Sequence, residues 1–203
     1  MKIALIGASG NAGSRIVNEA IARGHQVTGI ARHTEKIAPR ENLRVVAGDV
    51  AKPRELADLL AGHDVVVSAV RFVAFDIADL FEALKLARAP RLVMVGGAGS
   101  LKTASGGVLA DVPAFPEAAK SEARAGAEKL QALRGQNEID WTFLSPSALF
   151  APGERTGSYR VGAEELLTAA DGKSRISQED YAIALLDEIE TPRHRRERFT
   201  VGY

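Results

Sequence analysis

The chain has 203 residues, of which 46% are hydrophobic and 26% are charged, a composition typical of a single globular domain. Its 26 basic and 26 acidic residues give a formal net charge of zero, which offers no electrostatic basis for binding nucleic acid or an anionic membrane. The absence of cysteine excludes disulfides and thiol chemistry, and the four scattered histidines lack metal-ligand spacing, so we expect no metal site and assign His25, His33, His63 and His194 to surface or loop positions.

The first predicted unit is a strand from Ile3 to Ile6, followed by a glycine-rich turn and a helix. Glycine stands at every third position of the turn (Gly7, Gly10 and Gly13), and the apolar spacing from Ile16 to Ile21 is helical. Glycine lets backbone approach a ligand closely, and a helix N-terminus presents free N–H groups. The unit therefore predicts a pyrophosphate site, with an ordinary tight turn before a helix as the alternative.

This turn resembles the phosphate loop of the extended and atypical short-chain dehydrogenase/reductase families, which bind NAD(P). Its spacing is G-x-x-G-x-x-G rather than the G-x-G-x-x-G of common dehydrogenases. The resemblance implies cofactor contacts from the turn and the start of the helix, at Gly7, Ser9, Gly10, Asn11, Ala12 and Gly13.

The end of the second predicted strand, Gln26 to Ala31, bears on the choice between NAD and NADP. In a dinucleotide fold an acid at this place binds the 2′-hydroxyl of NAD, whereas an arginine accommodates the 2′-phosphate of NADP. Arg32 follows the strand, and no acid precedes Glu35. This pattern predicts a preference for NADP(H) over NAD(H), with a solvated surface arginine as the alternative.

Three further strands end in residues with expected cofactor contacts. After the strand from Leu43 to Ala47, the resemblance places Asp49 at the adenine edge, although aspartates also cap turns. Strands from Asp64 to Val67 and from Arg91 to Val95 follow, and the second of them ends in a glycine cluster. Ligands of open parallel sheets bind at the carboxyl ends of the strands, so we add Val50, Ser68, Ala69, Val70, Gly96 and Gly97 to the cofactor site.

The second half of the chain supplies the expected substrate side. The connection from Thr103 to Pro116 is long enough for a lid or a substrate wall, and a helix from Glu117 to Arg134 with a narrow Ala/Gly face follows it. A strand from Asp140 to Leu144 leads into the next crevice loop. The candidate substrate-binding residues are Ser100, Phe115, Ser145, Pro146 and Phe150, with ordinary packing as the alternative.

A capping box from Ser177 to Asp180 opens a final helix, and a last strand is predicted from Phe199 to Val201. The basic run from Arg193 to Arg198 between them is interpreted as a solvated turn. The alternation of strands and helices predicts an α/β fold: a Rossmann-type, doubly wound, mostly parallel sheet with helices on both faces. We expect residues 1–203 to form one NAD(P)-binding domain, with a small substrate-side region at about 145–203.

The whole chain resembles the bacterial atypical short-chain reductases grouped as NADH-flavin reductases, which are related to NmrA-like regulators and biliverdin reductase B. Five segments in order carry this resemblance: Gly7 to Gly13, Val95 to Leu101, Asp140 to Pro146, Pro152 to Gly157 and Arg175 to Ala182. The resemblance implies a flavin as hydride acceptor.

One departure from the wider superfamily bears on the chemistry. Typical short-chain dehydrogenases use Tyr-x-x-x-Lys, in which the tyrosine transfers the substrate proton. Counting back from Asp140 places that tyrosine near Glu122 or Ala123, whereas aligning Lys120 with the motif's lysine places it at Pro116. The chain's three tyrosines all lie beyond the predicted helix from Glu117 to Arg134, which should carry the motif. No catalytic residue is therefore assigned.

Two functions fit the missing tyrosine. The first is an NAD(P)H-dependent reductase that passes hydride to a flavin or quinone, and the second is a non-catalytic NADP(H)-sensing regulatory protein. We expect a small-molecule acceptor as partner, no nucleic acid, no membrane, and a monomer or homodimer. The chain shows no signal-peptide pattern and no apolar run of transmembrane length, so a cytoplasmic location is expected.

Overall fold

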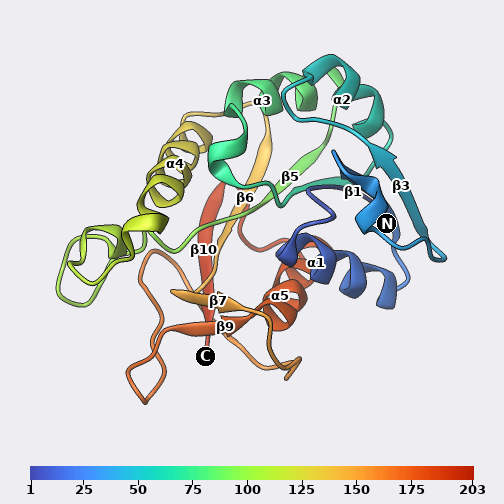
Figure 1. Cartoon of the computed structure of the whole chain (residues 1–203). Helices are drawn as coiled ribbons and strands as arrows, with labels where there is room; N and C mark the ends of the chain where they lie inside the picture. The colour runs from blue at the N-terminus through green and yellow to red at the C-terminus, as the bar shows by residue number, and fades with distance from the viewer.

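The computed structural model describes residues 1–203 and is built around one central sheet of eight strands (Figure 1). The strand order is β3-β2-β1-β4-β5-β6-β10-β8, and every neighbouring pair is parallel except β8, which runs antiparallel to β10. The order reverses at β1, because β2 and β4 pair with its opposite edges. This is the doubly wound topology that the sequence predicts, and the predicted fold class is confirmed.

The strands agree closely with the predicted apolar runs, which are continuous because helices cover both faces of the sheet. Their bounds are β1 Lys2–Ile6, β2 Gln26–Ala31, β3 Leu43–Ala47, β4 Val65–Ser68, β5 Arg91–Val95, β6 Asp140–Ser145 and β10 Glu197–Gly202. Three short strands were not predicted: β7 Leu149–Ala151, β8 Arg160–Gly162 and β9 Arg175–Ser177. β7 and β9 form a separate two-stranded sheet at the carboxyl side of the large one (Figure 1).

The helices divide between the two faces of the sheet. One apolar core lies under α1 and α5, and the other lies under α2, α3 and α4. The helices are α1 Asn11–Ala22, α2 Pro53–Leu60, α3 Ile77–Leu86, α4 Glu117–Arg134 and α5 Gln178–Glu190, with short 3-10 turns η1 Thr34–Lys36, η2 Phe72–Ala74 and η3 Leu109–Asp111. No helix combines the length and the apolar character that a membrane span requires.

Local signals explain where the helices begin and end. The Ser177 hydroxyl accepts a hydrogen bond from the Asp180 amide and starts α5, as the capping box predicts. Gly24 follows α1 with φ of +79°, a left-handed conformation that glycine adopts without strain. His25 lies in the loop between α1 and β2, as one of the two expected placements has it, but it is not a surface residue, since its ring is buried and its Nε2 lies 2.8 Å from a Glu190 carboxylate oxygen.

Candidate functional site

The turn between β1 and α1 has room for glycine alone at two of its positions. Gly7 has φ of +87°, and a Cβ atom there would lie 2.7 Å from the Ala69 carbonyl oxygen. A Cβ atom at Gly13 would lie 2.1 Å from the Gly7 carbonyl oxygen. Both distances are far below van der Waals contact, so glycine lets β1, the turn and α1 pack tightly against the segment after β4.

The same turn leaves several backbone donors without a partner. The amides of Ser9, Asn11, Ala12 and Gly13 donate to no acceptor in the protein, and no side chain caps α1. The first turn of α1 also carries no acidic residue. Such unpaired N–H groups at a helix N-terminus suit a phosphate, because the helix dipole favours negative charge at the same place.

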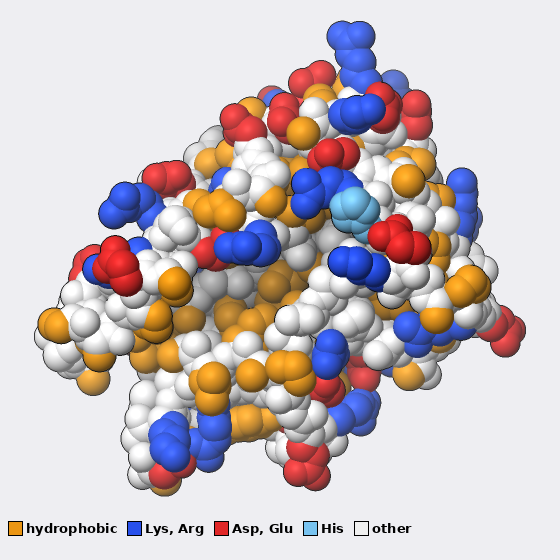
Figure 2. All heavy atoms as spheres, in the orientation of Figure 1, with side chains coloured by type: hydrophobic (Ala, Val, Ile, Leu, Met, Phe, Trp, Pro, Cys, Tyr) orange, Lys and Arg blue, Asp and Glu red, His pale blue; other side chains and the backbone are white.

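Of these donors, Ser9 lines a cleft of about 210 Å³ at the carboxyl ends of β1, β2, β3 and β4. Its lining brings together more than half of the cofactor residues expected from sequence: Gly7, Ser9, Gly10, Arg32, Asp49, Val50, Ala69 and Val70. In the middle of the face seen in Figure 2 the surface is hollowed, with hydrophobic side chains on the floor and basic side chains around the rim.

The cleft is bordered by more basic groups than the sequence indicated. Arg32 is exposed and forms no ion pair, which leaves its guanidinium available to a ligand. His33 and Arg71 also line the cleft, and neither was predicted as a ligand. Arg71 has one weak ion pair, at 3.4 Å from Glu122, and its side chain is 74% exposed. Asp49 lines the cleft and accepts the Ala51 amide at 3.1 Å, so it caps this turn, and its contact with the adenine edge stays a prediction.

The other expected cofactor residues lie outside the cleft lining: Asn11, Ala12, Gly13, Ser68, Gly96 and Gly97. The Ser68 side chain is buried, and its hydroxyl has no hydrogen-bond partner. Gly96 and Gly97 line a second, larger cavity of about 480 Å³. The two cavities meet at the segment after β4, where Arg71 lines the cleft and the neighbouring Phe72 lines the second cavity.

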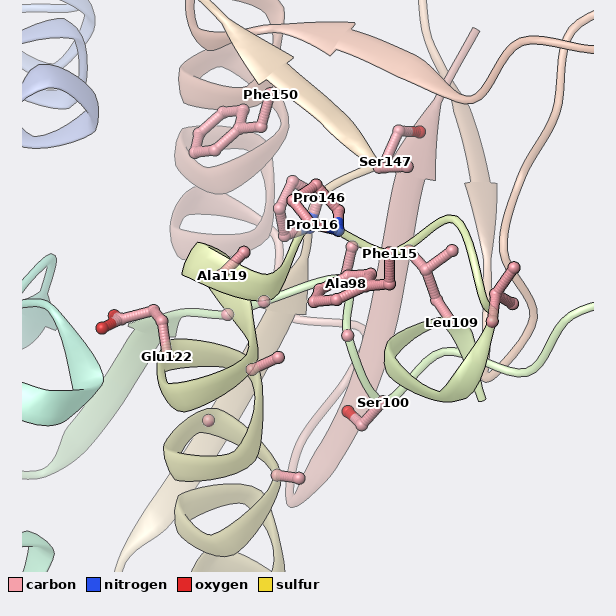
Figure 3. A pocket seen from close by; sticks show the side chains of 18 of the residues that line it. Ala98, Ser100, Leu109, Phe115, Pro116, Ala119, Glu122, Pro146, Ser147 and Phe150 are labelled. Carbon is pink, nitrogen blue, oxygen red and sulfur yellow. The ribbon is translucent and has the colours of Figure 1, made fainter. Parts of the chain in front are cut away.

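The second cavity gathers most of the substrate residues predicted from sequence. Ser100, Phe115, Pro146 and Phe150 all line it, and Figure 3 shows them arriving from different segments around one space. Ser145 does not belong to this lining, because its side chain is fully buried with an unpartnered hydroxyl. The sequence also did not indicate Phe72 or Glu122 as part of the wall.

The predicted Ala/Gly face of α4 forms one wall of this cavity. A Cβ atom at Gly126 would lie 2.8 Å from the Phe72 ring, so the absence of a side chain lets η2 pack directly on the helix. Gly99 meets α4 in the same way, since a Cβ atom there would lie 2.6 Å from the Ala123 methyl group. Small residues therefore bring the β5 loop and α4 close together and leave an apolar space beside them.

The polar side chains of the wall are hydrogen-bonded to the protein. Glu122 accepts the Phe72 amide at 2.6 Å, and Ser147 donates to the Val201 carbonyl at 3.0 Å. The Ser100 hydroxyl accepts from Arg198 Nη1 at 2.9 Å. Glu122 and Ser147 thus hold the surrounding chain in place, whereas the Ser100 hydroxyl keeps its own hydrogen free to donate.

Arg198 corrects the interpretation of the basic run as a solvated turn, because its side chain is only 2% exposed. It forms an ion pair with Glu164, which also pairs with Arg134 at 2.8 Å. Burial opposes the charged carboxylate, but the hydrogen bonds from Arg198 and Arg134 outweigh it and hold the pKa of Glu164 below its usual range. This network braces the Ser100 side of the cavity against β10.

The three tyrosines are all engaged away from the cavity. The Tyr181 hydroxyl is fully buried and donates to the Leu144 carbonyl at 2.6 Å, and burial raises its pKa. Tyr159 donates to Asp187, and Tyr203 donates to Asp180 at 2.7 Å. Burial and these carboxylate partners raise the pKa of both hydroxyls. The site therefore contains no tyrosine positioned as a proton donor.

Comparison with known proteins decides the family. Residues 7–192 match the family model described as NAD(P)H-binding. This chain belongs to the NAD(P)H-binding family. The match spans the glycine turn, both cavities and α5, and it confirms the resemblance to the atypical short-chain dehydrogenase/reductases.

Similar proteins cover the chain over its full length. The uncharacterised Bacillus subtilis protein YwnB is 43% identical over 216 residues, covering 99% of this chain and 98% of that protein. A Bacteroides thetaiotaomicron structure named as a candidate epimerase is 43% identical, with a TM-score of 0.94 and coverage of 100% and 96%. A Streptococcus pneumoniae structure named as a candidate NADH-flavin reductase is 37% identical, with a TM-score of 0.83 and coverage of 100% and 99%.

Proposed function

We propose that this protein is an NAD(P)H-dependent oxidoreductase that reduces a flat flavin or quinone acceptor without a tyrosine proton donor. The observation that carries the proposal is the cavity of about 480 Å³ next to the nucleotide cleft. Its lining is mostly apolar and contains no tyrosine, lysine or histidine. Such a space suits a flat ring, and it lacks the tyrosine and lysine that alcohol–ketone chemistry uses in typical short-chain dehydrogenases.

The residues of the cleft fit a dinucleotide. The unpaired amides of Ser9, Asn11, Ala12 and Gly13 would hold the pyrophosphate, and Arg32 would bind a 2′-phosphate. Gly96 and Gly97 would let the nicotinamide side approach the sheet closely, because they line the neighbouring cavity without side chains. The unpaired Arg32, with Arg71 on the same cleft, supports a preference for NADP(H) over NAD(H).

Bound NAD(P)H would supply a hydride, which carries two electrons and one proton. A quinone that accepts this hydride and one proton from water becomes a hydroquinone, and NAD(P)⁺ remains. The protein then needs no proton donor of its own. Its contribution is to hold the acceptor ring between Phe115, Pro146 and Phe150 beside the cofactor, which is catalysis by proximity and orientation.

The names of the relatives point in two directions. The candidate NADH-flavin reductase agrees with the proposed reaction, whereas the candidate epimerase does not. Epimerisation in the wider superfamily depends on the motif tyrosine, and here Tyr159, Tyr181 and Tyr203 are all hydrogen-bonded outside the cavity. The structure of this chain therefore favours the reductase.

The proposal extends to the organisation of the chain. We assign residues 1–203 to one nucleotide-binding domain in which the region of about 145–203 forms the substrate side. Pro146, Ser147 and Phe150 of this region line the cavity, and Glu164 and Arg198 brace it. We also assign the protein to the cytoplasm, where reduced nicotinamide cofactors are available.

The test is NADPH oxidation followed at 340 nm with riboflavin, flavin mononucleotide (FMN) and a simple quinone as acceptors. We expect acceptor-dependent oxidation that is lost in Gly10→Asp, whose carboxylate would occupy the phosphate position. If no acceptor raises the rate above that of the variant, the reductase proposal fails. NADPH binding without turnover would then support the NADP(H)-sensing function.

A further inference from the structure

The charge of the second cavity restricts the acceptors that it can hold, and this inference rests on the proposed reductase function. The lining contains no lysine, arginine or histidine, and Glu122 is its one acidic residue. Quinones and riboflavin are uncharged, whereas the phosphate of FMN carries a charge of about −1.5 to −2 near neutral pH. The cavity therefore supplies no cationic partner for that phosphate.

The cations nearest to the cavity are engaged elsewhere. Arg198 is buried behind Ser100 and paired with Glu164. Arg71 lines the nucleotide cleft, and at the edge of the second cavity it is already paired with Glu122 at 3.4 Å. Lys120 lines an adjoining hollow and forms an ion pair with Glu117 at 2.6 Å. A phosphate placed in the second cavity would lose water without gaining a charged partner.

The side chains of Glu122 and Ser147 do not replace the missing cation, and the free amides of Gly97 to Ser100 are neutral donors. Figure 3 shows the Glu122 side chain pointing away from Phe115 and Pro146, and its carboxylate accepts the Phe72 amide. The hydroxyl of Ser147 already donates to a backbone carbonyl. The wall therefore offers an anion no free donor from these side chains, and its one charge is of the same sign as the phosphate.

Apolar contact is what the cavity provides. Phe115, Phe150 and Pro146 offer flat ring surfaces. Ala119 and Ala123 have small side chains, which leave space in the cavity on the α4 side. We propose that the physiological acceptor is an uncharged ring without a phosphate, a quinone or a riboflavin-like flavin, and that the cavity discriminates against FMN and FAD. As in the proposed reaction, the acceptor would take a hydride from NAD(P)H and one proton from water.

Riboflavin and FMN form a matched pair, because they differ only in the phosphate. Flavin fluorescence is titrated with protein saturated with NADP⁺, and NADPH oxidation is measured with each flavin. We expect riboflavin to bind at least about fivefold more tightly and to show a kcat/KM higher by the same factor. If FMN bound as tightly as riboflavin or more tightly, the inference would be overturned, but the proposed reductase function would not be affected.

Two variants test whether the missing cation is the cause. Ala119→Lys adds a cation on the wall of the cavity, whereas Ser121→Lys adds the same charge at an exposed position of α4 outside the lining. The riboflavin-to-FMN ratio should fall by at least about threefold in Ala119→Lys and stay constant in Ser121→Lys. An unchanged ratio in Ala119→Lys, or equal changes in both, contradicts the inference. If no flavin or quinone is bound or reduced, the proposed function itself fails and this inference falls with it.

Discussion

Single residues decide whether the nucleotide cleft can form and what it binds. Gly13 is required by packing, because its absent side chain leaves room for the Gly7 carbonyl. Gly10 is less constrained, since a Cβ atom there would lie 3.3 Å from the Gly7 carbonyl oxygen. The regular glycine spacing made both positions predictable. Arg71 was not predictable, because its role depends on how the segment after β4 turns toward the cleft.

This difference between the glycines gives a first prediction. Gly10→Asp should keep the fold and abolish NADPH binding, because it brings a negative charge to the phosphate position, whereas Gly10→Ala should retain most of the affinity. Gly13→Ala should destabilise the turn itself, since a contact of 2.1 Å cannot be relieved without moving backbone. Calorimetric titration with NADPH and urea unfolding separate these effects. Unchanged NADPH affinity in Gly10→Asp would remove the turn from the site.

The second prediction at the residue scale concerns the basic rim of the cleft. A charge-assisted hydrogen bond contributes about 1.5–3 kcal/mol, which corresponds to about 10- to 150-fold in affinity. Arg32→Ala should weaken NADPH binding by this factor and leave NADH binding nearly unchanged. Lys36→Ala, at an exposed position outside the cleft lining, is the matched control. Equal losses for both cofactors would show that Arg32 does not bind the 2′-phosphate.

At the scale of elements, the loop from Pro152 to Gly157 is held by carboxylates of α1 and α5. Glu179 accepts the Gly153 amide at 2.8 Å, and Glu19 pairs with Arg155 at 2.9 Å. Asp180, which is fully buried, accepts the Gly157 amide at 2.9 Å and the hydroxyls of Thr156 and Tyr203. These contacts attach the loop to the helices on one face of the sheet and fix its course toward β8.

This attachment predicts a stability loss in acid. Burial opposes ionisation of Asp180, but its hydrogen bonds outweigh that effect and hold its pKa below the usual range. A carboxyl with a lowered folded pKa stabilises the fold above its unfolded pKa, and this stabilisation is lost as pH falls through the folded value, below about pH 4. Asp180→Asn should therefore lower the free energy of unfolding by about 1.5–3 kcal/mol at pH 7 and by less at pH 3.

Urea unfolding at pH 7 and pH 3 checks this prediction. Asp171→Asn serves as the control, because Asp171 is exposed and its pKa is also lowered, by the Lys173 amide and Arg175. That variant should change stability little at either pH. An effect of Asp180→Asn that is the same at both pH values would mean that its charge does not stabilise the loop.

Long elements were easier to predict than short ones. The bounds of α4, Glu117–Arg134, follow from its periodicity and from the proline before it. The three-residue strands β7, β8 and β9 carry no recognisable alternation, and they exist because neighbouring chain pairs with them. The prediction that Ser145 lines the substrate cavity failed for a related reason. Its position at the end of β6, next to the crevice loop, does not determine which side of the sheet its side chain faces.

At the scale of the whole molecule, the reversal of strand order at β1 places both cavities at the carboxyl edge of one sheet. A ligand in the cleft touches segments after β1, β2, β3 and β4 at once, so binding should stabilise the entire domain. NADPH at about 100 times its Kd should raise the free energy of unfolding by about 2.7 kcal/mol. Thermal unfolding with and without NADPH measures this effect, and Gly10→Asp should show none.

The central claim is that the two cavities hold two reactants, the cofactor in the cleft and the acceptor beside Phe115 and Phe150. Ala119→Trp would fill the second cavity from α4 without touching the cleft, and Ser121→Trp places the same ring at an exposed position of that helix. The deciding measurement is NADPH oxidation by a simple quinone, together with the Kd for NADPH.

The predicted result is a fall in kcat/KM for the quinone of at least about tenfold in Ala119→Trp, with the Kd for NADPH unchanged and Ser121→Trp equal to the wild type. A wild-type rate of quinone reduction in Ala119→Trp would contradict the account, because the acceptor would then have to bind elsewhere.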